Sequence, residues 1–153
     1  MGPINRDTTF NAVAVSVALE LAGVAAIAVN TDRKFFGCSY EDLTNIKSAV
    51  SIPVMCSDVV VYPYQIYQAR LAGADAIKLF APALPDKDLM YFYKIAAALG
   101  MQSVVVVSSV KQMLMALNIP GVKMVSINNR NMATWVLDNT RVSRILGDAE
   151  GEL

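Results

Sequence analysis

The chain has 153 residues, 13 basic and 13 acidic side chains, and no histidine. This length suits a single domain over residues 1–153 with a sizeable core. The balanced charge argues against a nucleic-acid-binding surface, which needs clustered basic side chains. The lack of histidine removes the commonest general base and the commonest metal ligand. Hydrophobic residues make up 55% of the chain, which favours a buried parallel sheet or a surface kept for a partner.

Local patterns indicate neither a membrane span nor a metal site. The most apolar stretch is interrupted by Ser16, Glu20 and Gly23, and a spanning helix tolerates a central carboxylate poorly. The first residues lack the basic start and apolar core of a signal peptide. Cys38 and Cys56 have neither a metal-binding nor a redox spacing. We therefore expect a reduced compartment, no metal and no cofactor.

Apolar periodicity and turn residues predict alternating helices and strands. The predicted helices cover residues 9–21, 39–50, 63–73, 85–100, 109–119 and 139–146, and the predicted strands cover residues 25–29, 53–61, 76–80, 102–107 and 124–128. We expect a frayed tail after the last helix. Strands that alternate with helices of this length indicate parallel βαβ units with right-handed crossovers. Periodicity alone leaves open whether they form a doubly wound sheet or part of a barrel.

Three helix starts carry specific signals. Ser39 and Ser109 each begin a capping-box pattern, with Asp42 in place of the usual Glu or Gln in the first and Gln112 in the second. Pro63 stands at the expected first turn of its helix, where the missing N–H costs nothing. These signals predict the first residues of the helices more closely than their last residues.

Three ordered segments resemble one known family. Residues 31–36 read T-D-R-K-F-F, residues 63–76 contain P-Y-Q-I-Y, A-R and G-A-D-A, and residues 127–130 read I-N-N-R. Their order and spacing are similar to those of the indole-3-glycerol phosphate synthase family, a (β/α)8 barrel of tryptophan biosynthesis. The run from Cys56 to Val61 is similar to plant versions. The resemblance implies an α/β fold, an incomplete TIM-barrel-like (β/α) repeat with about five parallel strands.

The resemblance also implies site residues. Phe36, Asn128 and Arg130 match substrate-contacting positions of the family. The family's lysine acid falls on Ser57 and its fifth-strand glutamate falls on Val106, so neither residue can transfer the proton that the family's reaction requires. The family's first-strand motif and its phosphate-binding seventh and eighth strands have no counterpart in these 153 residues. From this comparison we expect remnants of a binding surface and no catalytic residue.

Structural alternatives stay open for each remnant. Phe36 could be a packing residue, Asn128 could simply terminate a strand, and Arg130 could pair with Asp32 or Asp58. Lys78 lies within an apolar strand, and the sequence does not fix which face of the sheet it occupies. The helix that carries residues 91–93 should expose at least one of its three aromatic side chains.

These observations support three hypotheses about function. The first is a non-catalytic, synthase-like structural or assembly subunit of a larger complex, with a protein partner or a second copy covering the open sheet edges. The second is an indole-3-glycerol phosphate synthase after all, as a fragment or as a chain completed by a second polypeptide. The third is a small-molecule sensor that uses Asn128 and Arg130. The plant-like run predicts a chloroplast or other plastid location, with the cytoplasm as the alternative.

Overall fold

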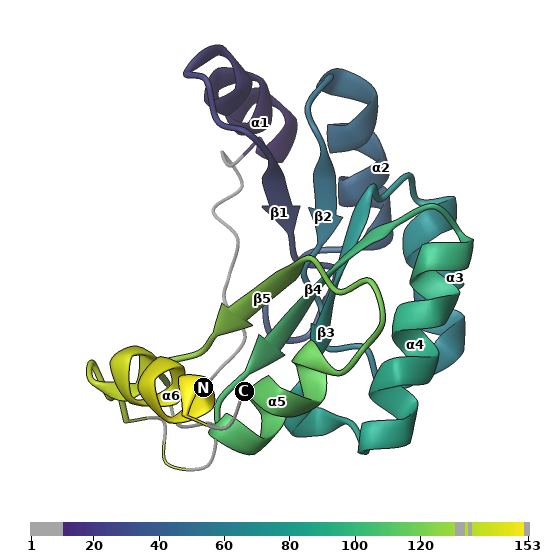
Figure 1. Ribbon diagram of the computed structural model, residues 1–153. Helices are drawn as coiled ribbons and strands as arrows, with labels where there is room; N and C mark the ends of the chain where they lie inside the picture. Colours follow the sequence, from purple (N-terminus) through teal and green to yellow (C-terminus); the bar gives the residue numbers. More distant parts are fainter. Residues whose placement is uncertain (1–10, 131–133, 135, 152–153) are drawn as a thin grey trace.

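The computed structural model describes residues 11–130, 134 and 136–151. Strands and helices alternate along the chain (Figure 1). The helices are α1 (Ala12–Leu21), α2 (Tyr40–Ala49), α3 (Pro63–Leu71), α4 (Asp86–Ala98), α5 (Val110–Leu117) and α6 (Arg141–Glu150), with a short 3-10 helix η1 (Ala81–Ala83). The strands are β1 (Ile27–Val29), β2 (Val54–Cys56), β3 (Ala76–Phe80), β4 (Gln102–Val107) and β5 (Met124–Ile127).

The strands form one parallel sheet in the order β1-β2-β3-β4-β5. Each strand therefore pairs only with its neighbours along the chain, as right-handed βα units of a barrel do. Among the described residues, β1 has only β2 as a partner and β5 has only β4. The expectation of about five parallel strands in an open, TIM-barrel-like sheet is confirmed.

One face of the sheet carries the core. Ile77 and Leu79 of β3 and Val105 and Val107 of β4 are fully buried, and they alternate with less buried residues. Helices α3, α4 and α5 lie along this face, and α2 packs against β2 (Figure 1). Helix α1 packs against α2, and α6 packs against α5. The opposite face of the sheet has no helix over it in the described part of the chain.

The strand predicted over residues 53–61 is wrong in its second half, because β2 ends at Cys56. The N–H of Val59 donates to the Asp58 carboxylate at 2.7 Å. The N–H groups of Val61 and Tyr62 donate to Oε1 of Gln65 at 2.8 and 2.9 Å. Side chains thus replace the sheet as hydrogen-bond partners, and the segment becomes a loop despite its β-branched residues.

The last helix also differs from the prediction, since it covers Arg141–Glu150. Asp138 accepts hydrogen bonds from the N–H and hydroxyl of Thr140, at 3.1 and 2.7 Å, and its backbone oxygen accepts the N–H of Arg141. Ile145 and Ala149 are buried one turn apart. This apolar pair carries the helix past Gly147, so the expected fraying does not begin there.

The predicted helix starts are largely confirmed. Ser39 and Asp42 form a complete capping box, with Asp42 Oδ2 accepting the Ser39 N–H at 2.8 Å. Ser109 caps α5, but Gln112 accepts the N–H of Ser108 instead of that of Ser109. Pro63 occupies the first turn of α3 as expected.

Asp75 ties the amino-terminal ends of three strands to α2. Its carboxylate accepts hydrogen bonds from Lys47 Nζ at 2.7 Å and from the Val54 N–H at 2.8 Å. Its own N–H donates to Val54, and its carbonyl accepts the N–H of Gln102. Burial alone would raise the pKa of Asp75, but these two donors outweigh burial and lower it.

Asp75→Asn is expected to lower the free energy of unfolding of the chain by about 1–3 kcal/mol at pH 7, because it removes a charged acceptor from two donors. Since the folded-state pKa is depressed, this contribution is present above the ordinary aspartate pKa of 3.8 and is lost as the pH falls through the folded value. Urea unfolding at pH 7 and at acid pH measures both effects. Asp148→Asn, an exposed site with the same charge change, is the control. Equal stability of the two variants at pH 7 would contradict this role.

Candidate functional site

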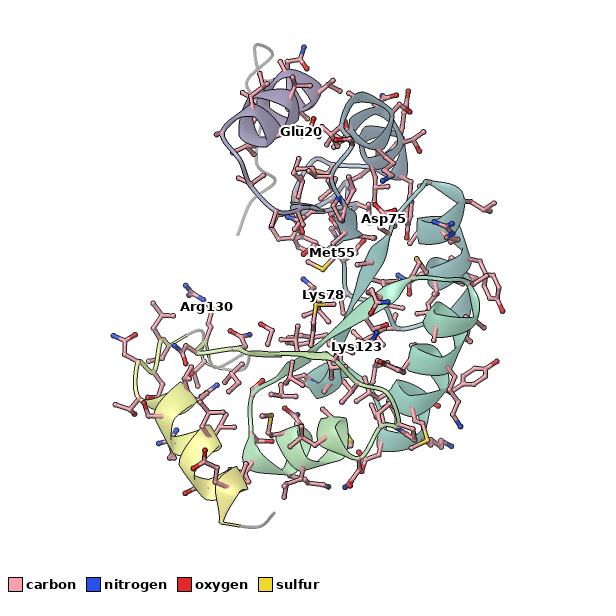
Figure 2. All side chains as sticks on the ribbon, turned by 45° about the horizontal axis from the view of Figure 1, so that its top comes forward. Glu20, Met55, Asp75, Lys78, Lys123 and Arg130 are labelled. Carbon is pink, nitrogen blue, oxygen red and sulfur yellow. The ribbon has the colours of Figure 1, made fainter. Side chains whose placement is uncertain are left out.

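The helix-free face of the sheet is the candidate site, and we call it the concave face. Strand alternation places Met55 of β2, Lys78 of β3 and Val104 and Val106 of β4 on it. Lys78 stands beside Val104, and Phe80 stands beside Val106. Figure 2 shows Met55 and Lys78 pointing toward the open side of the sheet, while Arg130 lies to the side of them in the segment after β5.

Lys78 lies half buried on this face of the sheet. This answers the question, left open by the sequence, of which face it occupies. Its Nζ donates to the backbone oxygen of Ser57 at 3.0 Å. Burial lowers the pKa of Lys78, although the nearby Asp58 carboxylate and Cys56 thiol act to raise it. The concave face therefore holds a cation that gives up its proton more readily than an exposed lysine.

A polar cluster supports the carboxyl ends of β1 and β2. The buried Thr31 hydroxyl donates to Asp58 Oδ2 at 2.8 Å and lies 3.7 Å from the Cys56 sulfur. Burial raises the pKa of the Cys56 thiol, so it stays protonated at neutral pH. Burial and the nearby Cys56 raise the pKa of Tyr40 to about 12, although a hydrogen bond with Thr31 acts to lower it. The cluster fixes Asp58, whose other oxygen accepts the Val59 N–H.

Asn128 and Arg130 follow β5 directly. The N–H of Asn128 donates to Val107 at 2.8 Å, and its side-chain oxygen accepts the N–H of Arg130 at 3.0 Å. Asn128 thus has the strand-ending geometry that the sequence offered as an alternative to substrate contact. Arg141 donates to the backbone oxygens of Asn128 and Arg130, at 3.5 and 3.3 Å. Helix α6 therefore helps to hold this segment in place.

The remaining predicted positions differ in exposure. Phe36 lies in the loop after β1 and is half exposed, so it does not belong to the hydrophobic core. Ser57 is partly buried at the end of β2, and Val106 is buried beside Phe80. Of the three aromatic residues on α4, Phe92 is buried and Tyr91 is exposed, as expected.

Two features of the site could not be found from the sequence. Thr31 and Asp58 are 27 residues apart, and only the pairing of β1 with β2 brings their side chains together. The place of Lys78 on the concave face requires the register of β3, which an apolar run does not reveal.

Other kinds of site find no support in the described residues. Their Cys, Asp and Glu side chains form no group of three that could hold a metal ion, and Cys38 and Cys56 form no disulfide. None of their helices has the length and hydropathy that crossing a bilayer requires. A cavity of about 610 Å³ lies between α4 and α5, lined by Met90, Leu114 and Met115 among others. It lies in the helix layer and shares no lining residue with the concave face.

The parallel sheet in chain order, with its helices on one face and polar groups at the carboxyl ends of the strands, defines part of a TIM-barrel-type α/β protein. Two solved structures share this fold. One is a mandelate oxidase, with a TM-score of 0.59 and 17% identity over 74% of this chain and 44% of that one. The other is a mandelate racemase/muconate lactonizing enzyme from Jannaschia sp. CCS1, with a TM-score of 0.57 and 16% identity over 75% of this chain and 30% of that one. At these identities the likeness concerns the fold alone.

Sequence comparison identifies the family. The model of the indole-3-glycerol phosphate synthase family matches residues 1–152, and the chain belongs to that family. The indole-3-glycerol phosphate synthase of Microcystis aeruginosa is 44% identical over 143 residues, which are 94% of this chain and 48% of that protein. The synthase of Trichodesmium erythraeum is 43% identical over 152 residues, 99% of this chain and 50% of that protein. The chain spans about half the length of these curated relatives.

Proposed function

We propose that this chain supplies five strands, and the part of the substrate site carried on them, to an indole-3-glycerol phosphate synthase. Further strands, in the same polypeptide or in a second one, complete the barrel. The observation that carries the proposal is the concave face itself. The Lys78 amine reaches the Ser57 oxygen just after β2, and Arg130 follows β5. Enzymes of this fold bind their substrates at the carboxyl ends of the strands. Two relatives named indole-3-glycerol phosphate synthase match 94% and 99% of this chain.

The open edges of the sheet support completion by further strands. In the described residues β1 and β5 each lack a second neighbour, and edge strands with free N–H and C=O groups invite pairing. The concave face also exposes Met124 of β5. Closure of the barrel would cover such apolar side chains and satisfy both edges.

The native assembly tests this proposal. The polypeptide that carries this chain should be tagged in its source, isolated with whatever accompanies it, and assayed with 1-(2-carboxyphenylamino)-1-deoxyribulose 5-phosphate. We expect formation of indole-3-glycerol phosphate and a native mass above the 16.5 kDa of the chain. A relative such as the Microcystis synthase serves as the positive control. A folded assembly without turnover, beside an active control, would reject the proposal.

A second candidate is a non-catalytic assembly subunit, favoured by Ser57 and Val106. A neutral hydroxyl and a valine stand where the resemblance implies an acid and a glutamate, and a general acid or base typically contributes about 10²- to 10⁴-fold. The same isolation separates the two candidates, because a large complex without turnover supports this one. A plastid location belongs to both proposals, and fluorescence imaging of the tagged polypeptide tests it.

A further inference from the structure

The amine of Lys78 is placed by the strand that carries it. Its neighbours Ile77 and Leu79 are fully buried on the helix-covered face, so the alternation of β3 turns Lys78 to the concave face. In the neighbouring strand β4, the residue paired with Lys78 is Val104. On the other side, Met55 pairs with Ala76 and Cys56 pairs with Ile77. Ser57, the residue that follows β2, lies next to Lys78 and accepts its hydrogen bond. A lysine in the middle of an apolar strand is costly to bury, so its position requires an explanation.

The protein uses only part of the hydrogen-bonding capacity of Lys78. Its Nζ donates to the Ser57 oxygen at 3.0 Å, and this is its one hydrogen bond with the described residues. An ammonium group has three N–H donors. Figure 2 shows the side chain pointing to the open side of the sheet, so the remaining donors are available to a molecule bound there.

The surroundings of Lys78 act on its pKa in opposite directions. The Cys56 thiol of β2 and the Asp58 carboxylate of the loop after β2 act on it, and from β4 it meets the uncharged Val104. Burial is the largest influence and lowers the pKa of Lys78. The Asp58 carboxylate, which Thr31 holds in place, acts in the opposite direction and raises it. A general acid works best when its pKa lies near the working pH.

We propose that Lys78 contacts the substrate on the concave face through Nζ and donates a proton to it. This inference rests on the proposed function. In the ring closure that the function requires, a carbon–carbon bond forms at the substrate's carbonyl carbon. As it forms, an N–H bond of Lys78 breaks and an O–H bond forms on the former carbonyl oxygen. Lys78 is left as a neutral amine and regains its proton from water. Ser57 contributes its backbone oxygen, which orients the amine.

The test compares Lys78→Met, Lys78→Arg and the control Lys94→Met, which removes an exposed lysine from α4, in the native assembly. Lys78→Met is expected to lower kcat by about 10²-fold or more. Lys78→Arg keeps the positive charge but does not give up its proton, so it should lower kcat similarly while KM changes little. The wild-type kcat should fall at alkaline pH as Lys78 loses its proton. Lys94→Met should match the wild type.

The outcomes separate this inference from the proposed function. An active wild type with Lys78→Met within about threefold of it overturns the role of Lys78 and leaves the function standing. Full activity in Lys78→Arg overturns proton donation. An inactive wild type rejects the proposed function. In that case, calorimetric titration with indole-3-glycerol phosphate tests whether Lys78 contacts the bound molecule. Binding at least about tenfold weaker in Lys78→Met, a loss of about 1.4 kcal/mol, supports the contact. Equal binding, or none in the wild type, overturns it.

Discussion

Val106→Glu is expected to raise kcat of the native assembly by about 10²-fold or more, which is the contribution of a general base. Val106 lies on the concave face beside Phe80, two residues along β4 from the partner of Lys78. The resemblance to the family implies a glutamate at this position, and the structure places the side chain on the same face as the amine. A carboxylate here would accept the proton that the later deprotonation step releases.

The matched variants for this experiment are Gln68→Glu and Ser57→Lys. Gln68 is an exposed residue of α3, so its replacement adds the same charge outside the concave face and should leave kcat within about threefold. Ser57→Lys should also add little, because Lys78 already supplies an ammonium group beside it. Steady-state kinetics on the isolated assembly measures all three. No gain from Val106→Glu in a folded, substrate-binding assembly would support the non-catalytic candidate.

Leu79→Ala is expected to lower the free energy of unfolding by about 2–5 kcal/mol. Leu79 lies in β3, the middle strand of the sheet, and is fully buried on the face covered by helices. Truncation removes apolar contacts and leaves a cavity that a close-packed core fills only partly. For a domain whose total stability is about 5–15 kcal/mol, this is a large fraction. Chemical denaturation followed by circular dichroism measures it.

Leu71→Ala provides the control with identical chemistry. Leu71 ends α3 and is 87% exposed, so its replacement should change stability by less than about 0.5 kcal/mol. A similar loss in both variants would mean that β3 does not carry the core.

The sequence predicted the fold where local pattern and environment agree. Residues 76–80 and 102–107 form β3 and β4 as predicted, because their apolar and β-branched side chains lie in the middle of the sheet. The prediction failed after Cys56, where the Asp58 and Gln65 side chains capture backbone N–H groups that a strand would offer to its neighbours. Such competition depends on rotamers, which propensity does not describe.

The site was predicted in part. The resemblance pointed to Ser57, Val106 and Arg130, and their roles stay a prediction. In the structure Ser57 follows β2 and Val106 lies near the carboxyl end of β4, with β3 between the two strands. Lys78 was singled out as an unusual residue, but its place on the concave face depended on a strand register that only the assembled sheet defines. The support that Thr31 gives to Asp58 likewise arises from a contact between distant segments.

The strands lie in the sheet in the same order as in the chain, and this order has a consequence for folding during synthesis. Every strand pairing joins segments that follow each other in synthesis, so no pairing within the sheet waits for a distant segment. Pairing between consecutive strands keeps the loops short and so lowers the entropic cost of closing them. The sheet can therefore grow on the ribosome one βα unit at a time, as repeat proteins do, with each finished strand serving as the template for the next.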